Sequence, residues 1–230
     1  MFEYLSKLSS FKLLVVFLIE NLLVTGIALL AGWITLKLYK RPIKPASYTE
    51  VVTCIVTNCI NTLVTFTGFK LWQYGIISFQ FSFSWFVIVD TLLLFLAMDL
   101  AMYVFHLSIH RSIGYKIIHR FHHVYHDPIP IDLFVLHPLE TLGFGMLWLT
   151  VIYLYSFNFW DVMIYLTLNV VFGIAGHLGF EPLSPKLRDS ALFKYIGTST
   201  FHHDHHTDVN HNFGFYTSLW DRLFNTYKAT

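Results

Sequence analysis

The sequence predicts an all-α integral membrane protein, a bundle of about four or five spans with a histidine-rich helical cap on one side. Three observations favour this class. Hydrophobic residues make up 55% of the 230 residues and charged residues only 13%, whereas about a quarter of the residues in a soluble chain are charged. Apolar runs of about 20 residues, long enough to cross a bilayer, recur along the chain. Thirteen histidines occur, nearly all in the second half.

The composition also excludes several classes of protein. A net charge of +1 gives no electrostatic reason to bind nucleic acid, and the apolar balance excludes a disordered chain or a coiled coil. The two cysteines, Cys54 and Cys59, lie in one apolar stretch. We therefore expect both to be small core residues, with no disulfide framework and no cysteine-based zinc site.

The first expected span covers residues 13–36, an apolar run interrupted by Glu20, Asn21 and Thr25. A signal peptide is the alternative for such an N-terminus. It is disfavoured because the stretch is long and no clear small-residue cleavage site follows a short apolar core. The sequence therefore predicts a retained span.

Four further spans are expected, at residues 48–69, 85–105, 133–155 and 159–175. The second carries Thr or Asn at every fourth position, a polar stripe that suits helix–helix contact. Only residues 156–158 link the last two spans, which therefore form a hairpin. These two helices either both cross the bilayer or form a re-entrant hairpin that does not reach the far side.

Basic residues predict the orientation, because they concentrate on the cytosolic side of membrane proteins. With five spans, twelve of the fifteen Lys and Arg residues fall on one side. That side, which includes the C-terminus and the histidines, is expected to be the cytosol. The membrane would be the endoplasmic reticulum or a bacterial inner membrane.

Nine histidines occur at spacings that bring rings together on a helix. One pair is spaced i, i+4; two triplets are spaced i, i+3, i+4, which places side chains on one helical face; a single histidine ends the fifth span. These nine are His106, His110, His119, His122, His123, His177, His202, His205 and His206.

Metal binding is the physical reason for such sets, since imidazole binds Fe, Zn, Cu and Ni. One ion takes about four to six ligands, so nine histidines fit two ions. An unliganded cationic cluster beside a membrane would be costly. The patterns H-E-x-x-H and E-x-x-H are absent, and no cysteine is placed to bind. An all-nitrogen site in a membrane favours redox iron with O2 over hydrolysis.

The order of these histidines resembles that of the fatty acid hydroxylase/sterol desaturase superfamily, integral-membrane non-haem di-iron oxidases. The boxes are H-x3-H, H-x2-H-H and H-x2-H-H. Their flanks agree, including D-L-A-M-Y-V-F-H-L-S-I-H-R, H-P-L-E, G-H-L-G-F-E-P and L-W-D-R-L-F-N-T, although Leu107 replaces the usual Arg and Phe105 falls near the usual Trp. The likeness covers residues 92–227 and is greatest to the sterol C5-desaturase and C4-methyl oxidase branches.

The resemblance implies a function and a domain division. Residues 1–84 would hold N-terminal spans, and residues 85–230 a fatty acid hydroxylase-like catalytic domain with a cytosolic di-metal site. The nine histidines would bind two non-haem Fe ions, with O2 as co-substrate. A separate cytochrome b5-, ferredoxin- or rubredoxin-like carrier would supply two electrons. The substrate would be a sterol-like or fatty acyl lipid, hydroxylated or desaturated at a C–H bond.

Other residues near the boxes have expected roles. His137 is a candidate tenth ligand or a residue that orients one, and Glu181 either completes a site or lies at the surface. Asp99 lies two turns before His106 and is expected to orient a ligand histidine through its second ring nitrogen. We expect Trp220 to be an interfacial aromatic and Asp221 to pair with its neighbour Arg222 or with a histidine. Three histidines interrupt the pattern and are expected not to bind metal: His126, His203 and His211.

Two alternatives remain open from the residues alone. A zinc-dependent membrane hydrolase could use the same scaffold, and would need neither O2 nor a reductant. A metal transporter should carry polar ligands near the middle of its spans, whereas these histidines cluster at one surface.

Overall fold

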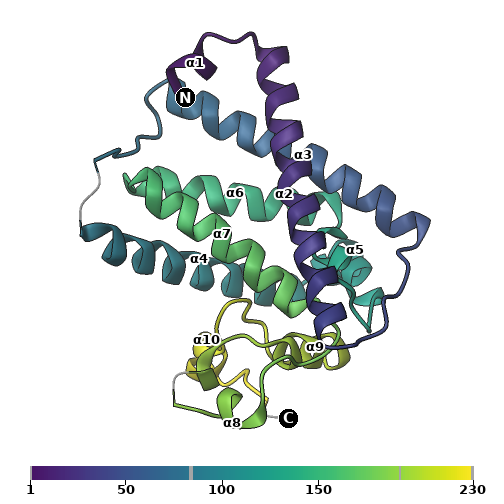
Figure 1. Cartoon of the computed structure of the whole chain (residues 1–230). Helices are drawn as coiled ribbons and strands as arrows, with labels where there is room; N and C mark the ends of the chain where they lie inside the picture. Colours follow the sequence, from purple (N-terminus) through teal and green to yellow (C-terminus); the bar gives the residue numbers. More distant parts are fainter. Residues whose placement is uncertain (1, 83–84, 192, 229–230) are drawn as a thin grey trace.

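The computed structural model describes residues 2–82, 85–191 and 193–228, and the regular structure in them is helical apart from two isolated β-bridges. Each element is identified by its label in Figure 1. In chain order they are α1 (Phe2–Ser6), α2 (Ser10–Leu38), α3 (Tyr48–Gln73), α4 (Phe86–His110), α5 (Gly114–Ile117), η1 (His119–Val124), η2 (Pro130–Phe134), α6 (Pro138–Leu154), α7 (Phe159–Gly176), α8 (Pro185–Arg188), η3 (Phe193–Tyr195), α9 (Ser199–Thr207) and α10 (Leu219–Leu223).

Four of these helices, α2, α3, α4 and α7, are long and apolar enough to cross a membrane, and α6 is a shorter apolar helix. The predicted helical membrane bundle of about four or five spans is confirmed. Large apolar side chains on these helices remain exposed, with Leu23 at 61% and Ile27 at 67%. Such an apolar surface is favourable in contact with lipid and unfavourable in contact with water.

The start of the fourth expected span is corrected. It was expected at residue 133, but residues 130–134 form the short helix η2 and α6 begins only at Pro138. Proline is favoured in the first turn of a helix, because its missing N–H needs no partner there. His137 precedes it as the N-cap, and its Nδ1 accepts a hydrogen bond from the Leu139 N–H.

Short polar residues cap three of the four long helices, whereas α4 has no side-chain cap. Ser9 caps α2, and Ser47 caps α3 in a reciprocal arrangement with Glu50. Asn158 caps α7, where its side chain accepts from the Trp160 N–H. Each cap pairs a backbone N–H that the first helical turn leaves without a partner.

A polar residue of α3 makes a helix–helix contact, but it is Asn58, which lies outside the predicted stripe of Thr53, Thr57, Asn61 and Thr65. Thr25 of α2 donates a hydrogen bond to the Asn58 side chain of α3 over 2.9 Å, and both residues are buried. The prediction that both cysteines are core residues is correct for Cys54 and wrong for Cys59, which is exposed. The two lie five positions apart on α3, far enough round the helix to face differently.

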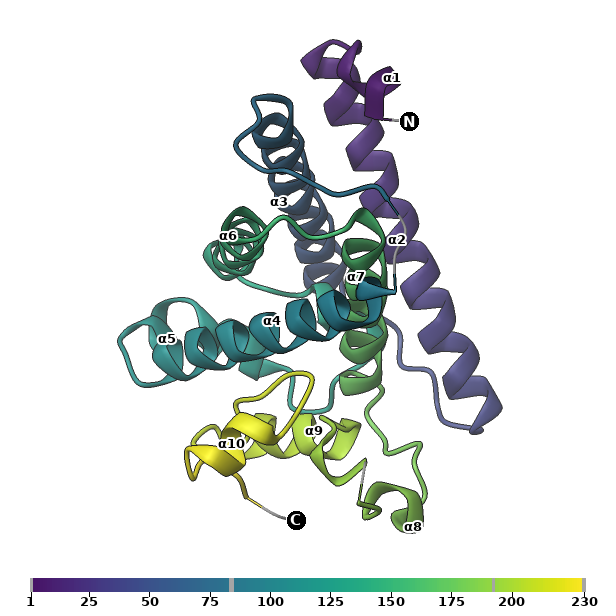
Figure 2. The same ribbon diagram turned by 90° about the vertical axis from the view of Figure 1, so that its left-hand side faces the viewer.

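The chain from α8 to α10 forms a cap at one end of the bundle. In Figures 1 and 2 the helices α8, α9 and α10 lie together at the end opposite α1, on one side of α4. Helix α9 packs against α7, while α4 packs against α6 and α7. Tyr216, fully buried, joins the core that α4, α6 and α7 share. The cap is therefore fixed to the ends of the helices that carry the other histidines.

Candidate metal centre

The structure brings all nine predicted histidines together at the junction of bundle and cap. They come from the C-terminal end of α4, from η1, from the residue that ends α7, and from α9. Their ring nitrogens form two separate groups, in each of which one nitrogen per residue lies within 4.8 Å of all the others.

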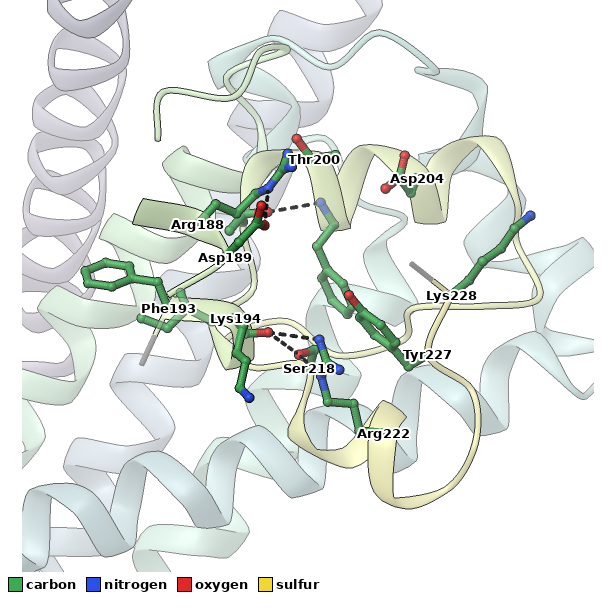
Figure 3. Close-up of a pocket in the computed structure, with 13 residues that line it drawn as sticks. Arg188, Asp189, Phe193, Lys194, Thr200, Asp204, Ser218, Arg222, Tyr227 and Lys228 are labelled. Carbon is green, nitrogen blue, oxygen red and sulfur yellow. Dashed lines mark hydrogen bonds and ion pairs between the residues drawn. The ribbon is translucent and has the colours of Figure 1, made fainter. Parts of the chain in front are cut away.

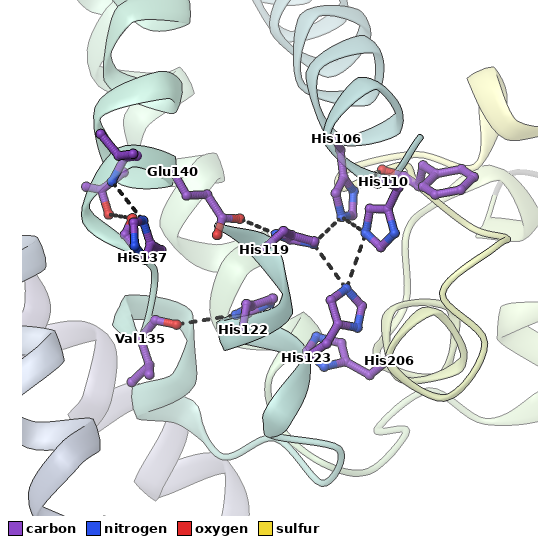
Figure 4. Close-up of polar contacts among 12 residues, drawn as sticks. His106, His110, His119, His122, His123, Val135, His137, Glu140 and His206 are labelled. Atoms are coloured by element: carbon purple, nitrogen blue, oxygen red, sulfur yellow. Dashed lines mark hydrogen bonds and ion pairs between the residues drawn. The ribbon is translucent and has the colours of Figure 1, made fainter. Parts of the chain in front are cut away.

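The first group contains five histidines, and we call it the five-histidine group: His106, His110, His119, His123 and His205. The Nε2 atoms of His106 and His119 are 2.9 Å apart, and those of His119 and His123 are 3.0 Å apart. The His110 Nε2 lies 3.2 Å from that of His106 and 3.3 Å from that of His123. Figure 4 shows the four rings of α4 and η1 pointing toward one another.

The second group contains four buried histidines, and we call it the four-histidine group: His122, His177, His202 and His206. The Nε2 atoms of His202 and His206 are 3.2 Å apart. The ring centroids of His122 and His206 are 4.7 Å apart, and those of His177 and His202 are 4.6 Å apart.

Neighbouring histidines of one box belong to different groups. His122 lies in the four-histidine group and His123 in the other, and the same holds for His206 and His205. Consecutive residues on a helix point about 100° apart, while residues i and i+4 nearly align. The expectation that each triplet presents a single face is therefore corrected: each triplet supplies both groups, which adjoin, with the His123 and His206 centroids 4.8 Å apart.

Backbone carbonyls orient several of the rings. The Nδ1 of His106 lies 2.7 Å from the Phe213 carbonyl oxygen, and that of His205 lies 2.7 Å from the His211 carbonyl oxygen. The Nδ1 of His177 lies 2.8 Å from the Gly173 carbonyl oxygen. A carbonyl can only accept, so each Nδ1 carries the proton and each Nε2 presents its lone pair to the group.

A carboxylate orients one further ring. Glu140, buried in the first turn of α6, places Oε1 2.7 Å from the Nδ1 of His119, as Figure 4 shows. Metal-binding histidines typically donate their other N–H to such a partner. The motif H-P-L-E contains this glutamate, but the sequence alone assigned it no role. Its signal was an acidic residue at the start of an apolar helix, close after the second histidine box.

The arrangement of nitrogens fits bound cations. The Nε2 atoms of His177 and His205 are buried without a hydrogen-bond partner among the described residues. His106 and His119 both use Nδ1 as donor, so their facing Nε2 atoms, 2.9 Å apart, are two lone pairs with no proton between them. A metal ion between such nitrogens satisfies them all.

The histidines that lie outside the spans are kept by burial in the neutral form that a metal requires. It lowers the pKa of His119 to about 3. Burial and neighbouring histidines lower the pKa of His177 to about 3, and burial lowers that of His122 to about 4 although Glu140 raises it. Burial and adjacent rings also hold the pKa of His202 and His205 well below the usual value. These imidazoles are therefore uncharged at neutral pH and free to bind a cation.

Two candidate ligands lie outside both groups. His137 caps α6, where its Nδ1 already accepts from the Leu139 N–H. The Glu181 carboxylate accepts from the N–H groups of Leu183 and Thr200, which supports the first turn of α9. Both residues are occupied as caps of backbone segments, and the structure does not bring them to the metal groups.

The expected role of Asp99 is wrong. Its buried carboxylate accepts from the N–H groups of Tyr216 and Thr217 and from the Trp220 Nε1, not from a histidine. Asp99 thus holds the C-terminal segment against α4. Trp220, expected at the membrane interface, is half-buried and is a partner in this contact.

Asp221 also differs from expectation. Among the described residues it forms no hydrogen bond with Arg222 or a histidine ring, although His211 interacts with its charge, and it accepts instead from the backbone N–H groups of Phe213 and Gly214. The three interrupting histidines lie outside both metal groups. His126 contacts the His206 carbonyl oxygen through Nδ1, and His211 contributes its carbonyl to His205.

A polar pocket of about 230 Å³ lies on the other face of α9, away from the histidines (Figure 3). Thr200, Phe201 and Asp204 of α9 line one wall, while His202, His205 and His206 of the same helix project into the metal groups. Four basic and two acidic residues contribute to its lining: Arg188, Lys194, Arg222, Lys228, Asp189 and Asp204.

Known proteins resemble the part of the chain that contains these histidines. The model of the fatty acid hydroxylase family matches residues 91–226. Lathosterol oxidase of Homo sapiens is 29% identical over 154 residues, which cover 65% of this chain and 48% of the relative. Methylsterol monooxygenase 1 of Danio rerio is 30% identical over 125 residues, 54% of this chain and 42% of the relative.

A fungal relative, the Delta(7)-sterol 5(6)-desaturase of Leptosphaeria maculans, is 27% identical over 131 residues, 56% of this chain and 34% of the relative. The chain therefore spans about half the length, or less, of the curated relatives it matches. No solved structure matches it. Because the family model covers more than half of the sequence, including every histidine of the two groups, the chain belongs to the fatty acid hydroxylase family.

Proposed function

We propose that this chain is a membrane-bound oxidoreductase that uses O2 and two electrons to hydroxylate or desaturate a C–H bond of a lipid. The observation that carries the proposal is the pair of adjoining all-histidine groups at the ends of apolar helices. The sterol oxidases, monooxygenases and desaturases among its relatives support oxidation of a sterol-like or fatty acyl lipid.

Two non-haem iron ions are the proposed cofactors, one held by the five-histidine group and one by the four-histidine group. When bound, they supply the redox chemistry that activates O2. An all-imidazole set without thiolate or carboxylate suits iron, and two sets exceed the needs of one ion. Surrounding residues keep four of the nine rings in place: Glu140 and the carbonyls of Gly173, His211 and Phe213 hold the protons at the Nδ1 atoms of His119, His177, His205 and His106.

The proposed site excludes water and adjoins lipid. Seven of its nine histidines are buried, and His106 and His110 lie at the membrane end of the group on α4. Exclusion of water prevents loss of a reactive oxidant to solvent. The exposed apolar surfaces of the spans support access of an apolar substrate from the bilayer.

We infer that the two electrons come from a separate acidic carrier, cytochrome b5-, ferredoxin- or rubredoxin-like. The basic lining of the pocket in Figure 3 supports this inference, because four basic and two acidic side chains give it more positive charge than the whole chain, whose net charge is +1. The pocket lies at the end of the cap, one helix away from the histidines. A carrier docked there would face the site across α9 alone.

The proposed orientation places this cap in the cytosol, as the concentration of basic residues in the histidine-bearing loops and the C-terminal segment supports. The zinc hydrolase and the metal transporter receive no support from the site. The relatives named above are oxidases, monooxygenases or desaturases, and the histidines lie at the ends of α4 and α7 and in the short helices η1 and α9 rather than along the middle of the spans.

Lipid analysis tests the function. The protein is expressed in a host membrane or reconstituted with extracted lipids, an electron donor and O2. Mass spectrometry should reveal a lipid that has gained one oxygen atom or lost two hydrogen atoms, and only when both O2 and reductant are present. A product that forms without either would favour the hydrolase, and transport of metal without a lipid product would favour the transporter.

A further inference from the structure

Residues 211–214, between α9 and α10, supply two of the carbonyls that orient metal-site histidines. The His205 Nδ1 donates to the carbonyl of His211, and the His106 Nδ1 donates to the carbonyl of Phe213, each over 2.7 Å. His205 belongs to α9 and His106 to α4. One short loop thus sets the ring orientation of two histidines from distant parts of the chain, both in the five-histidine group.

A buried carboxylate holds the backbone of this loop at Phe213 and Gly214. Asp221 of α10 is 0% exposed. Its Oδ1 accepts from the Phe213 N–H over 2.8 Å, and its Oδ2 accepts from the Gly214 N–H over 2.7 Å. Thr226 adds a third donor through its hydroxyl at 2.6 Å from Oδ1. The peptide unit between Phe213 and Gly214 is therefore fixed at both ends, by the carboxylate at its N–H and by His106 at its carbonyl, while the preceding unit is held by the carboxylate at the Phe213 N–H.

The conformation of the loop matches this attachment. Asn212 has φ of +61°, in the left-handed region that asparagine tolerates better than most residues. Its side chain accepts from the Lys228 N–H, and its backbone N–H donates to the Thr226 carbonyl. At Gly214 an added Cβ would lie 2.2 Å from the Thr217 carbonyl oxygen and 2.8 Å from the Asp221 Oδ2, so a larger residue does not fit.

We propose that Asp221 is a positioning residue for the five-histidine group, which acts on His106 and His205 through the carbonyls of residues 211–214. Asp221 touches no ring of the group. The inference rests on the proposed metal-binding function, because it assigns a role toward the same ions. It predicts a selective effect, since His177 and His122 of the four-histidine group take their Nδ1 contacts from Gly173 and Val135, outside this loop.

The test compares Asp221→Asn with wild type as full-length protein in detergent. The amide of asparagine offers one acceptor and one N–H₂ donor, so one of the two backbone N–H groups loses its partner and meets another donor. Replacing a residue that orients metal-binding histidines lowers metal affinity by about 10- to 100-fold. We expect wild type to titrate with two tight equivalents of Co²⁺, used as a coloured probe, and the variant to keep one tight equivalent and weaken the other.

The visible absorption of bound Co²⁺ reports the coordination directly and is independent of turnover. The signal that the variant retains should match that of His205→Ala, which damages the same group, and not that of His206→Ala. Asp161→Asn is the matched control: Asp161 is another fully buried carboxylate that accepts a backbone N–H, at the far end of α7. It should keep both equivalents.

Three outcomes would overturn the proposal. Asp221→Asn could bind both ions as tightly as wild type, or could weaken the four-histidine group instead. It could also lose both ions together with its helix content, measured by circular dichroism, which would assign Asp221 to folding as a whole. A wild-type protein that binds fewer than two ions would instead contradict the proposed function, so the two failures are distinguishable.

Discussion

The five-histidine and four-histidine groups are held in place in different ways. In the four-histidine group, His177 donates to the Gly173 carbonyl one turn earlier on its own helix, and its neighbours are all buried. In the five-histidine group, His119 depends on the carboxylate of Glu140, and His106 depends on Phe213, 107 positions away in the sequence. The carbonyls that contact the four-histidine group lie at most 13 positions from their histidines, whereas the contacts of the five-histidine group extend to 107 positions. The five-histidine group should therefore respond more to changes made outside it.

The largest effect is expected from removing one histidine of each group. His205→Ala and His206→Ala should each abolish turnover and each lose a different ion, because these consecutive residues belong to different groups. Elemental analysis with turnover measurements checks this. His203→Ala is the matched control on the same helix, and it should keep both ions and most of the activity. Full activity with normal metal in His205→Ala, or total loss in His203→Ala, would contradict the division.

The second effect concerns the carboxylate support. Glu140→Gln keeps an oxygen near His119 but removes the negative charge that holds the Nδ1 proton, and we expect about 10- to 100-fold weaker metal binding by the five-histidine group alone. Metal titration measures the loss. Glu50→Gln, another buried glutamate that begins a helix, provides the control. Equal losses in the two variants would show that burial of a carboxylate, and not contact with His119, causes the change.

The third effect is a pH dependence near the four-histidine group. Asp132 lies in η2, three residues before Val135, whose carbonyl accepts from the His122 Nδ1 at 3.4 Å. Burial is the main cause that raises the pKa of Asp132 to about 7, and the neighbouring Glu50 adds to it. The hydrogen bond from the Ile129 N–H acts in the opposite direction and lowers the pKa.

A raised carboxyl pKa means that the folded protein binds more protons than the unfolded chain between about pH 4 and pH 7. This contribution to stability is present at low pH and is lost as the pH rises through about 7. The neutral side chain of Asp132→Asn should remove it. Thermal unfolding in detergent across this range should show wild type losing stability relative to the variant as pH rises, and parallel curves would contradict the account.

The smallest effect is expected at the pocket behind α9. Lys194→Glu should lower turnover supported by an acidic carrier several-fold, with a smaller difference at high salt, because charge complementarity mainly affects association. Single turnover of chemically reduced protein should not change, since Lys194 contacts neither group. An equal loss of turnover with the acidic carrier and with the chemical reductant would show that the carrier does not dock at this pocket.

The ligand groups show what sequence can and cannot predict here. The i, i+4 pairs follow from helix geometry, so the pairing of His106 with His110 and of His202 with His206 is readable from spacing. The division of His122 from His123 requires the positions of two other segments. Spacing within one helix does not contain that information.

The acidic residues show the same limit. Asp99 and Glu140 are both buried acids in apolar helices, and sequence reasoning chose Asp99 to orient a histidine. Its partners at Tyr216 and Thr217 lie 117 and 118 positions away, so only the fold reveals them. The expected helices were placed well because length and hydropathy are local properties, and the error at residues 133–137 arose because apolar residues continue before the helix begins.

The number of metal ions in a folded chain tests the central claim most directly. Wild-type protein, purified in detergent and loaded with Fe²⁺ under exclusion of air, should contain close to two ions per chain by elemental analysis, because the proposal assigns one ion to the five converging imidazoles and one to the four. One ion or none in a sample that retains its helix content and converts a lipid would contradict the account.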